Sequence, residues 1–124
     1  YEMGLSRQEK TMNNQQNFYV RSNRKYYNII ISKLSHIEAM KDYVILHYDG
    51  EKIPAALNLK SISEKLPSDR FLRVNRSFMI NTDFIQSIDK DLIDIGIREI
   101  TLGDKYKEEF QNYILKENII KRDY

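Results

Sequence analysis

Short apolar runs separated by polar breaks make up most of this sequence. Each run holds about three to seven residues and is flanked by turn formers such as Asn, Asp, Gly and Ser, which is the pattern of β-strands. The predicted strands lie at residues 18–20, 26–32, 37–40, 43–48, 52–56, 71–74, 78–80, 84–88, 92–97 and 100–102.

One turn in this series stands out by its chemistry. Asp49-Gly50 is the strongest hairpin signal in the chain, because both residues tolerate the positive φ of a type I′ turn. Pro54 lies in the strand that follows and has no backbone N–H to give to a ladder. We therefore expect that strand at a sheet edge or at a bulge.

A second hairpin is expected near the start of the domain, where residues 22–25 form a turn between the first two predicted strands. Arg21, Arg24 and Lys25 lie around this turn. They form either part of a basic rim or an ordinary solvated run of charges, and the second is the commoner case.

Two stretches depart from the strand pattern. In the first, Leu59, Ile62 and Leu66 recur at spacings of three and four, with Asn58 placed as an N-cap and Pro67 as a stop. This pattern predicts a helix of about two turns with one apolar stripe. Such a helix would cover the sheet and present its polar face to solvent.

The second stretch predicts a helix that begins at Asp104, because Asp is a favoured N-cap and Tyr106, Phe110, Tyr113 and Ile114 fall on one face. No strand–helix–strand alternation accompanies the two helices, which argues against a doubly wound parallel sheet. The sequence thus predicts a mainly β, antiparallel domain of about eight to ten strands, with a short internal helix and a C-terminal helix.

The domain is expected at residues 18–118. Residues 1–17 are rich in Asn, Gln, Lys and Glu and show no periodicity, so we expect a linker or a disordered segment there. Residues 119–124 are predicted to form a loose tail. Because the chain opens on Tyr1 and a polar segment, we expect it to be the C-terminal piece of a longer protein.

Residues 70–81 are the most distinctive part of the sequence. Two apolar runs, at 71–74 and 78–80, flank a polar break that the strands on either side would hold out as a presented surface. Side chains able to bind phosphate oxygens or a guanine edge gather in and beside this break. They are Arg73, Asn75, Arg76, Ser77 and Asn81. The alternative is a solvated connection whose arginines have no special role.

Composition narrows the choice of function. The 20 basic and 18 acidic residues give a net charge of +2, which does not by itself imply nucleic acid. The absence of cysteine excludes disulfides, thiolate catalysis and Cys-type zinc sites. No apolar run approaches the roughly 18 residues of a membrane span and no signal peptide is visible, so a cytoplasmic protein is expected.

Catalytic patterns are weak. His36 and His47 lack a metal-ligand spacing, and we expect both to be structural. Glycine is too scarce for a phosphate-binding loop, and the serines have no His–acid partners. The carboxylates are spread along turns and the last helix. We therefore expect neither an enzyme nor a cofactor.

Several short segments, taken in order, carry a family resemblance. They are Ile37-Glu38, Asp42-Tyr43-Val44, Leu59-Lys60, residues 71–81, Ile85, Ile88 and Tyr106. Over about residues 18–115 this series resembles the LytTR DNA-binding domain, the output half of LytR/AlgR-type bacterial response regulators. The resemblance implies consecutive small antiparallel sheets and loops, in place of a recognition helix, that enter successive major grooves of DNA.

The resemblance also implies which segments of the chain contact DNA. Its base-contacting loops fall at Lys41-Asp42, at Asn75-Arg76 and at residues 103–105. Arg76 can bind guanine N7 and O6. The chain departs from the family in having Asn75 where a His is usual, and Gly103-Asp104 where Ser-Arg is favoured. The expected base contacts are Lys41, Asp42, Asn75, Arg76 and Lys105, and the expected phosphate contacts are Lys60, Arg73, Ser77 and Asn81.

The partners implied by the resemblance are double-stranded DNA with paired half-sites and, in the parent protein, an N-terminal receiver domain that accepts a phosphoryl group in a two-component phosphorelay. The domain would bind DNA as a homodimer and be monomeric in isolation, away from any membrane. Two other functions stay open: a module that binds a peptide at a sheet edge, and a small hydrolase or nuclease. A steep fall of affinity with salt would distinguish DNA binding from peptide binding. Binding of a metal ion would indicate the hydrolase or nuclease.

Overall fold

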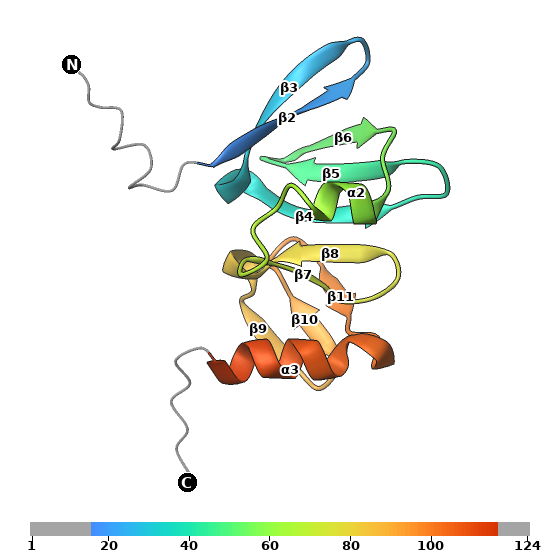
Figure 1. Cartoon of the computed structure of the whole chain (residues 1–124). Coiled ribbons are helices and arrows are strands. Elements are labelled where there is room, and N and C mark those ends of the chain that lie inside the picture. Colours follow the sequence, from blue (N-terminus) through green and yellow to red (C-terminus); the bar gives the residue numbers. More distant parts are fainter. Residues whose placement is uncertain (1–15, 117–124) are drawn as a thin grey trace, which may run out of the picture.

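The computed structural model describes residues 16–116 and builds them into ten strands, two α-helices and three short 3₁₀ turns (Figure 1). The strands form three antiparallel sheets of five, two and three strands. The predicted mainly β fold, with an internal helix and a C-terminal helix, is confirmed. The expected linker and tail lie outside the described residues, except that Asn17 is already the first residue of a strand.

The five-stranded sheet is the centre of the molecule, with strand order β6-β5-β4-β8-β7. Its strands are β4 (Leu34–Ala39), β5 (Val44–Tyr48), β6 (Glu51–Ala55), β7 (Phe71–Arg73) and β8 (Phe78–Asn81). The pairing of β4 with β8 joins two hairpins that are distant in the sequence, and places Glu38 opposite Phe78. This pairing brings the polar break of residues 74–77 beside the end of β4.

The local turn chemistry behaves as the sequence predicts. Asp49 and Gly50 have φ of +49° and +84°, as a type I′ turn between β5 and β6 requires. Pro54 lies on β6, an edge strand of the five-stranded sheet, so its missing N–H leaves no gap in the ladder to β5. Both expectations are confirmed.

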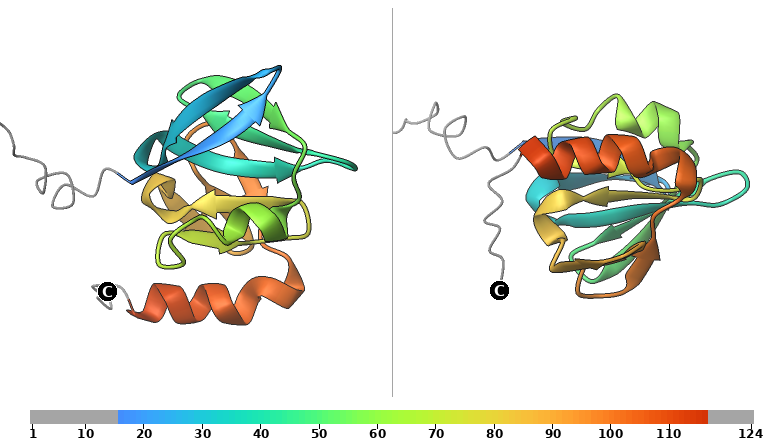
Figure 2. Two further views of the ribbon diagram at one scale, coloured as in Figure 1. Left: turned by 45° about the horizontal axis from the view of Figure 1, so that its top comes forward. Right: turned by 90° about the horizontal axis from the view of Figure 1, so that it is seen from below.

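A separate hairpin, β2 (Asn17–Ser22) and β3 (Lys25–Ile30), leans over β6 and extends away from the rest of the molecule (Figures 1 and 2). Its base is fixed by Val20 and Ile29, which are buried in the core of the five-stranded sheet. The predicted second strand ends earlier than expected, because Ile31–Lys33 form the 3₁₀ turn η1. This turn directs the chain from the hairpin into β4.

The third sheet has strand order β11-β10-β9 and packs with β7–β8 and the C-terminal helix α3 (Lys107–Lys116) around a shared core. Its strands are β9 (Ser87–Asp89), β10 (Leu92–Asp94) and β11 (Glu99–Thr101). The predicted strand at 84–88 is shortened by the 3₁₀ turn η2 (Thr82–Phe84). The helix expected from Asp104 opens as the 3₁₀ turn η3 (Asp104–Tyr106), and the N-cap position belongs to Gly103.

The short helix α2 (Leu59–Ser63) matches its predicted start. The side-chain oxygen of Asn58 accepts a hydrogen bond from the Ser61 backbone N–H at 2.8 Å, which is the expected N-cap. Leu59 and Ile62 are buried against the central sheet. The helix ends earlier than expected, and Leu66 lies in the turn that precedes Pro67.

Two hydrophobic cores meet at the β7–β8 hairpin. The first fills the space among the hairpin β2–β3, the central sheet and α2, and the second lies among β7–β8, the third sheet and α3. Side chains alternate along β7, so Phe71 enters the first core and Leu72 the second, and Met79 and Ile80 do the same on β8. The loop between β7 and β8 is therefore carried by strands that are packed on both faces.

Candidate nucleic-acid interface

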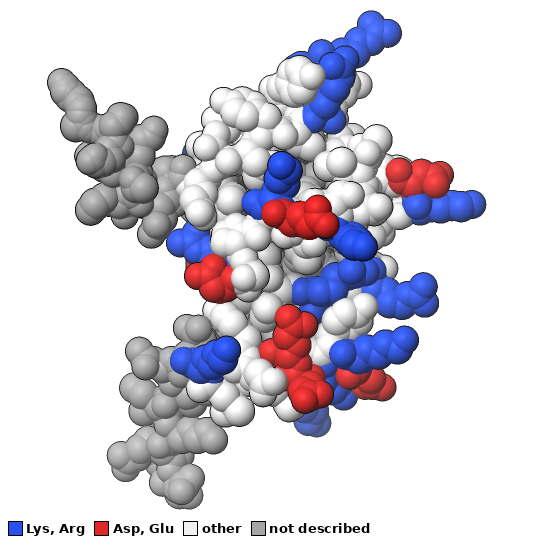
Figure 3. All heavy atoms as spheres, viewed as in Figure 1, with Lys and Arg blue, Asp and Glu red and all other residues white. Residues whose placement is uncertain are grey.

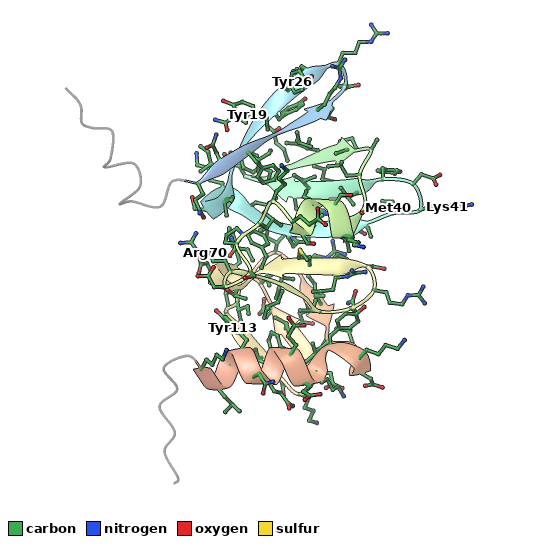
Figure 4. All side chains as sticks on the ribbon, in the orientation of Figure 1. Tyr19, Tyr26, Met40, Lys41, Arg70 and Tyr113 are labelled. Carbon is green, nitrogen blue, oxygen red and sulfur yellow. The ribbon has the colours of Figure 1, made fainter. Side chains whose placement is uncertain are left out.

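Three connections meet at one edge of the molecule, the right-hand edge in Figures 1 and 4. They are the β4–β5 corner (residues 40–43), the β7–β8 loop (residues 74–77) and the β11–α3 turn (residues 102–106). Figure 4 shows Met40 and Lys41 at the outermost point of the first connection. The three segments contain every position at which the sequence predicts a base contact.

Backbone hydrogen bonds join the three connections to each other. The Ala39 N–H, at the start of the β4–β5 corner, donates to the Ser77 carbonyl at 2.7 Å. The Gly103 N–H, in the β11–α3 turn, donates to the Val74 carbonyl at 2.7 Å. The β7–β8 loop is thus the middle member of the set, and it fixes the spacing of the other two.

Asn75 shapes the β7–β8 loop from within. Its side-chain oxygen accepts hydrogen bonds from the backbone N–H groups of Ser77 at 2.8 Å and Phe78 at 2.9 Å. Its amide group donates to the Thr101 carbonyl at 2.7 Å. Gly103 lies close to the same residue, since an added Cβ would lie 3.3 Å from Tyr106 Cδ2 and 3.4 Å from the Cβ of Asn75. The sequence predicts that the Asn75 side chain contacts a DNA base. In the structure its amide is already hydrogen-bonded and holds the loop to β11.

Arg73 supports the same loop. Its Nε donates to the Asn75 carbonyl at 2.9 Å and its Nη2 to the Arg76 carbonyl at 2.6 Å. The guanidinium also lies over the ring of Tyr106, 5.9 Å from its centroid. The remaining N–H groups can still meet a phosphate, but the side chain is tied to the protein first.

Three exposed cations remain at the ends of the three connections. Lys41, Arg76 and Lys105 are exposed, and none of them forms a side-chain hydrogen bond or salt bridge with another residue in the range 16–116. Ser77 is exposed next to Arg76. The predicted readers Lys41, Arg76 and Lys105 are therefore brought to one edge with their charges free.

The two acidic residues of this edge differ in their surroundings. Asp42 is exposed beside Lys41, and its carboxylate forms no salt bridge within the described part of the chain. Asp104 accepts an ion pair from the Lys107 ammonium at 3.1 Å, and Asp91 shares that ammonium at 3.3 Å. These two carboxylates raise the pKa of Lys107. The charge of Asp104 is thus partly compensated within the protein.

Asn81 does not belong to this surface, and its assignment to a phosphate is wrong. Its side chain is 0% exposed and its amide donates to the Leu34 carbonyl at 3.0 Å. Its oxygen accepts from the Asp83 N–H at 2.9 Å and so caps the turn η2. Asn81 thus links the end of β8 to the start of the neighbouring strand β4 and is buried.

Lys60 lies on the exposed face of α2. The start of this helix borders a hollow of about 370 Å³ whose other wall is the β4–β5 corner, with Leu59 and Ser61 facing Lys41 and Asp42. Lys60 is therefore near the candidate interface but outside the three connections.

Two histidines pair across the strands β4 and β5, which lead into the β4–β5 corner. The rings of His36 on β4 and His47 on β5 stack in parallel with centroids 3.9 Å apart. The His36 Nδ1 lies 2.8 Å from Ser35 Oγ, while its buried Nε2 has no hydrogen-bond partner among the described residues. Burial first, then the positive neighbours His47 and Arg98, lower the pKa of His36 to about 3. Both rings pack within the sheet, in line with the structural role expected for them.

One residue of this edge was missed by the sequence analysis. Arg98 lies 4.8 Å from the centroid of the Phe78 ring, and its Nη1 is 3.7 Å from Glu38 Oε1. It thus links the third sheet to the end of β4, beside the β7–β8 loop. A turn between β10 and β11 carries it, and only the non-local pairing of β4 with β8 reveals its position.

Within residues 16–116, no group of three or more His, Cys, Asp or Glu side chains is placed to hold a metal ion. None of the helices described is long and apolar enough to cross a membrane.

Comparisons with known proteins agree with this geometry. The family model described as the LytTr DNA-binding domain matches residues 24–115. Among solved structures, one described as the LytTr DNA-binding domain of a provisionally assigned methyl-accepting/DNA response regulator from Bacillus cereus is similar, with a TM-score of 0.70 and 19% identity. The match covers 79% of this chain and 95% of that one. A search of curated proteins found no match. From the family match, the chain belongs to the LytTr DNA-binding domain family.

Proposed function

We propose that this domain binds double-stranded DNA in a sequence-specific manner and acts as the output domain of a bacterial two-component response regulator that controls transcription. The observation that carries the proposal is the single edge where three linked connections present Lys41, Arg76 and Lys105. Their spacing is set by backbone hydrogen bonds, so the cations approach a duplex as one prearranged group. Entry of these connections into the major groove is part of the proposal.

Each side chain has a role in this proposal. Arg76 reads guanine N7 and O6 with its forked donors, and Lys105 contacts a base edge or a phosphate. Lys41 contacts a base edge or a phosphate from the β4–β5 corner. Beside it, Asp42 accepts a hydrogen bond from a cytosine amine. Asn75 acts chiefly by holding Arg76 in place, because its own amide is already hydrogen-bonded.

The phosphate contacts are Lys60, Ser77 and the remaining donors of Arg73. They flank the base-reading group and fix the register of the domain on the duplex. In the parent protein, a receiver domain before this chain would accept the phosphoryl group, and the protein would act in the cytoplasm as a homodimer on paired half-sites. The isolated domain is proposed to be monomeric, which sedimentation at high concentration can test.

The proposal is tested by selecting bound sequences from a random duplex pool and comparing two arginine variants on the selected site. Arg76→Ala is expected to cost about 1 to 3 kcal/mol of binding free energy and to relax preference at one base pair. Arg70→Ala is the matched control, because Arg70 lies at the opposite edge in Figure 4 and pairs with Asp83 at 3.7 Å. It should bind as the parent chain does.

Failure to select any sequence, or unchanged binding and specificity in Arg76→Ala, would refute sequence-specific recognition through this edge. A weak dependence of affinity on salt would instead favour a peptide as the partner, because phosphate contacts release counterions and a peptide groove does not.

A further inference from the structure

The hairpin β2–β3 carries positive charge without any acidic neighbour in the sequence. From residue 16 to residue 37 the chain has no Asp or Glu, whereas Arg21, Arg24, Lys25 and Lys33 lie in the same span. The first three surround the tip of the hairpin and all three are exposed. None of them forms a salt bridge with another described residue. Within residues 16–116, the tip is thus a compact cationic surface without a paired acidic side chain.

The backbone at the tip is unusual for the residues it holds. Asn23 and Arg24 have φ of +55° and +70°, in the left-handed region. The other type I′ turn has Gly50 at the second position, where the absence of a Cβ removes the strain, but here an arginine occupies it. Arg24 therefore occupies a backbone conformation that glycine adopts more readily.

Aromatic rings hold the cations of the hairpin. The Arg21 guanidinium lies 5.4 Å from the centroid of Tyr26, and its Nη1 donates to the Tyr26 hydroxyl at 3.3 Å. The Lys25 ammonium lies 5.2 Å from the centroid of Tyr27. These contacts limit the freedom of the two side chains while leaving them exposed, which reduces the entropy lost when they bind an anion.

The hairpin lies next to the candidate interface. A hollow of about 610 Å³ is lined on one side by Arg21 and Arg24 and on the other by Tyr43, which closes the β4–β5 corner. In both Figure 1 and the left view of Figure 2, the tip lies toward the same edge as the three connections. Figure 3 shows Lys and Arg side chains along this edge, from the hairpin at the top to the loops below.

We infer that the hairpin β2–β3 is a phosphate-binding arm, in which Arg21, Arg24 and Lys25 contact the backbone of the same duplex outside the groove entered by the β4–β5 corner. The inference rests on the proposed function, because it extends that interface. A duplex is the partner because the cations continue the row that includes Lys41, and because arginine and lysine contacts to phosphates need no sequence.

Arg24→Gly gives the sharpest test, since glycine suits the φ of the turn and the variant loses the charged side chain without straining the backbone. In the 124-residue chain, this variant should keep or raise the melting temperature. Its affinity for a random-sequence duplex, measured by fluorescence anisotropy between 50 and 300 mM salt, should fall about eightfold at 0.1 M salt. The salt slope should become shallower by about 0.9.

Two more variants complete the design. Arg21→Gln with Lys25→Gln should lower the slope by about twice as much. Lys116→Gln is the control, because Lys116 ends α3 and also carries one exposed charge. On a selected duplex, hydroxyl-radical footprints should lose protection at one outer end in Arg24→Gly, with the protected centre unchanged.

The outcomes separate this inference from the proposed function. If Arg76→Ala relaxes specificity while the hairpin variants keep the parental affinity, slope and footprint, the arm is refuted and the function stands. If the parent chain binds no duplex, both are refuted. If the hairpin variants bind duplex normally but lose binding to a polyglutamate peptide, the arm serves a protein partner and the inference is overturned.

Discussion

The β7–β8 loop and the β4–β5 corner lie side by side but are stabilised in different ways. The loop is held by three hydrogen bonds of the Asn75 side chain and two of Arg73. The corner is closed by one backbone hydrogen bond, from the Met40 N–H to the Tyr43 carbonyl at 2.8 Å. Loop geometry that depends on side chains is rigid but sensitive to mutation, whereas the corner leaves its side chains free to adapt to DNA.

Lowering the pH should have the largest effect on stability, because it protonates His36 on β4, the strand that joins the two regions. The pKa of His36 is about 3 in the folded protein, so between pH 6.5 and 3 the unfolded chain binds more protons. The stability present above pH 6.5 is therefore lost as the pH falls toward 3, by up to about 3 to 5 kcal/mol. Urea unfolding at several pH values measures this slope.

His36→Phe provides the control for that titration, since it keeps a ring beside Phe78 but cannot take up a proton. Its stability should depend less on pH than that of the parent chain over the same interval. Equal slopes in the two proteins would show that His36 is not the group responsible.

Asn75→Ala should have the next largest effect and tests the rigid side of the comparison. Three hydrogen bonds are lost, which corresponds to about 2 to 3 kcal/mol of unfolding free energy at a net value near 1 kcal/mol for each bond. DNA affinity should fall as well, because Arg76 is no longer held in place. Denaturation and anisotropy on the same samples would show both losses.

Asn75→Asp distinguishes the hydrogen bonds that the Asn75 side chain accepts from the one that it donates. It retains the acceptor for the Ser77 and Phe78 N–H groups but replaces the donor to the Thr101 carbonyl with a carboxylate oxygen, which that carbonyl repels. It should be more stable than Asn75→Ala. The reverse order would mean that the contact to β11 dominates.

Lys41→Ala should have the smallest effect and tests the adaptable side. Because the exposed side chain forms no hydrogen bond or salt bridge within residues 16–116, stability should stay within about 0.5 kcal/mol. Binding to DNA should weaken by roughly 1 kcal/mol, with a shallower salt slope. A large loss of stability would show that the corner is as tightly built as the β7–β8 loop.

The sequence predicts best those features that depend on neighbouring residues. The Asp49-Gly50 turn, the Asn58 cap and the edge position of Pro54 follow from local backbone chemistry, and the structure confirms all three. Asn81 and Asn75 could not be placed in this way. Whether a polar side chain near a loop faces solvent or a carbonyl depends on strands that are distant in sequence.

For Asn81 the reason is the sheet itself. The strand β8 has packed cores on both faces, so alternation along it does not mark an exposed side. Its amide therefore meets carbonyls of the segment before and within β4, which no local pattern indicates. Arg98 was missed for a different reason, because its partners Glu38 and Phe78 come together only through the non-local pairing of β4 with β8.

The pairing of Glu38 with Phe78 has a consequence for how the domain is made. Forty residues separate these partners, so a large loop must close before β4 and β8 meet. A chain still emerging from the ribosome, and not yet extended through β8, has no edge on which Lys41 and Arg76 stand together. On the proposed function, the edge that binds DNA therefore forms only when β4 has paired with β8.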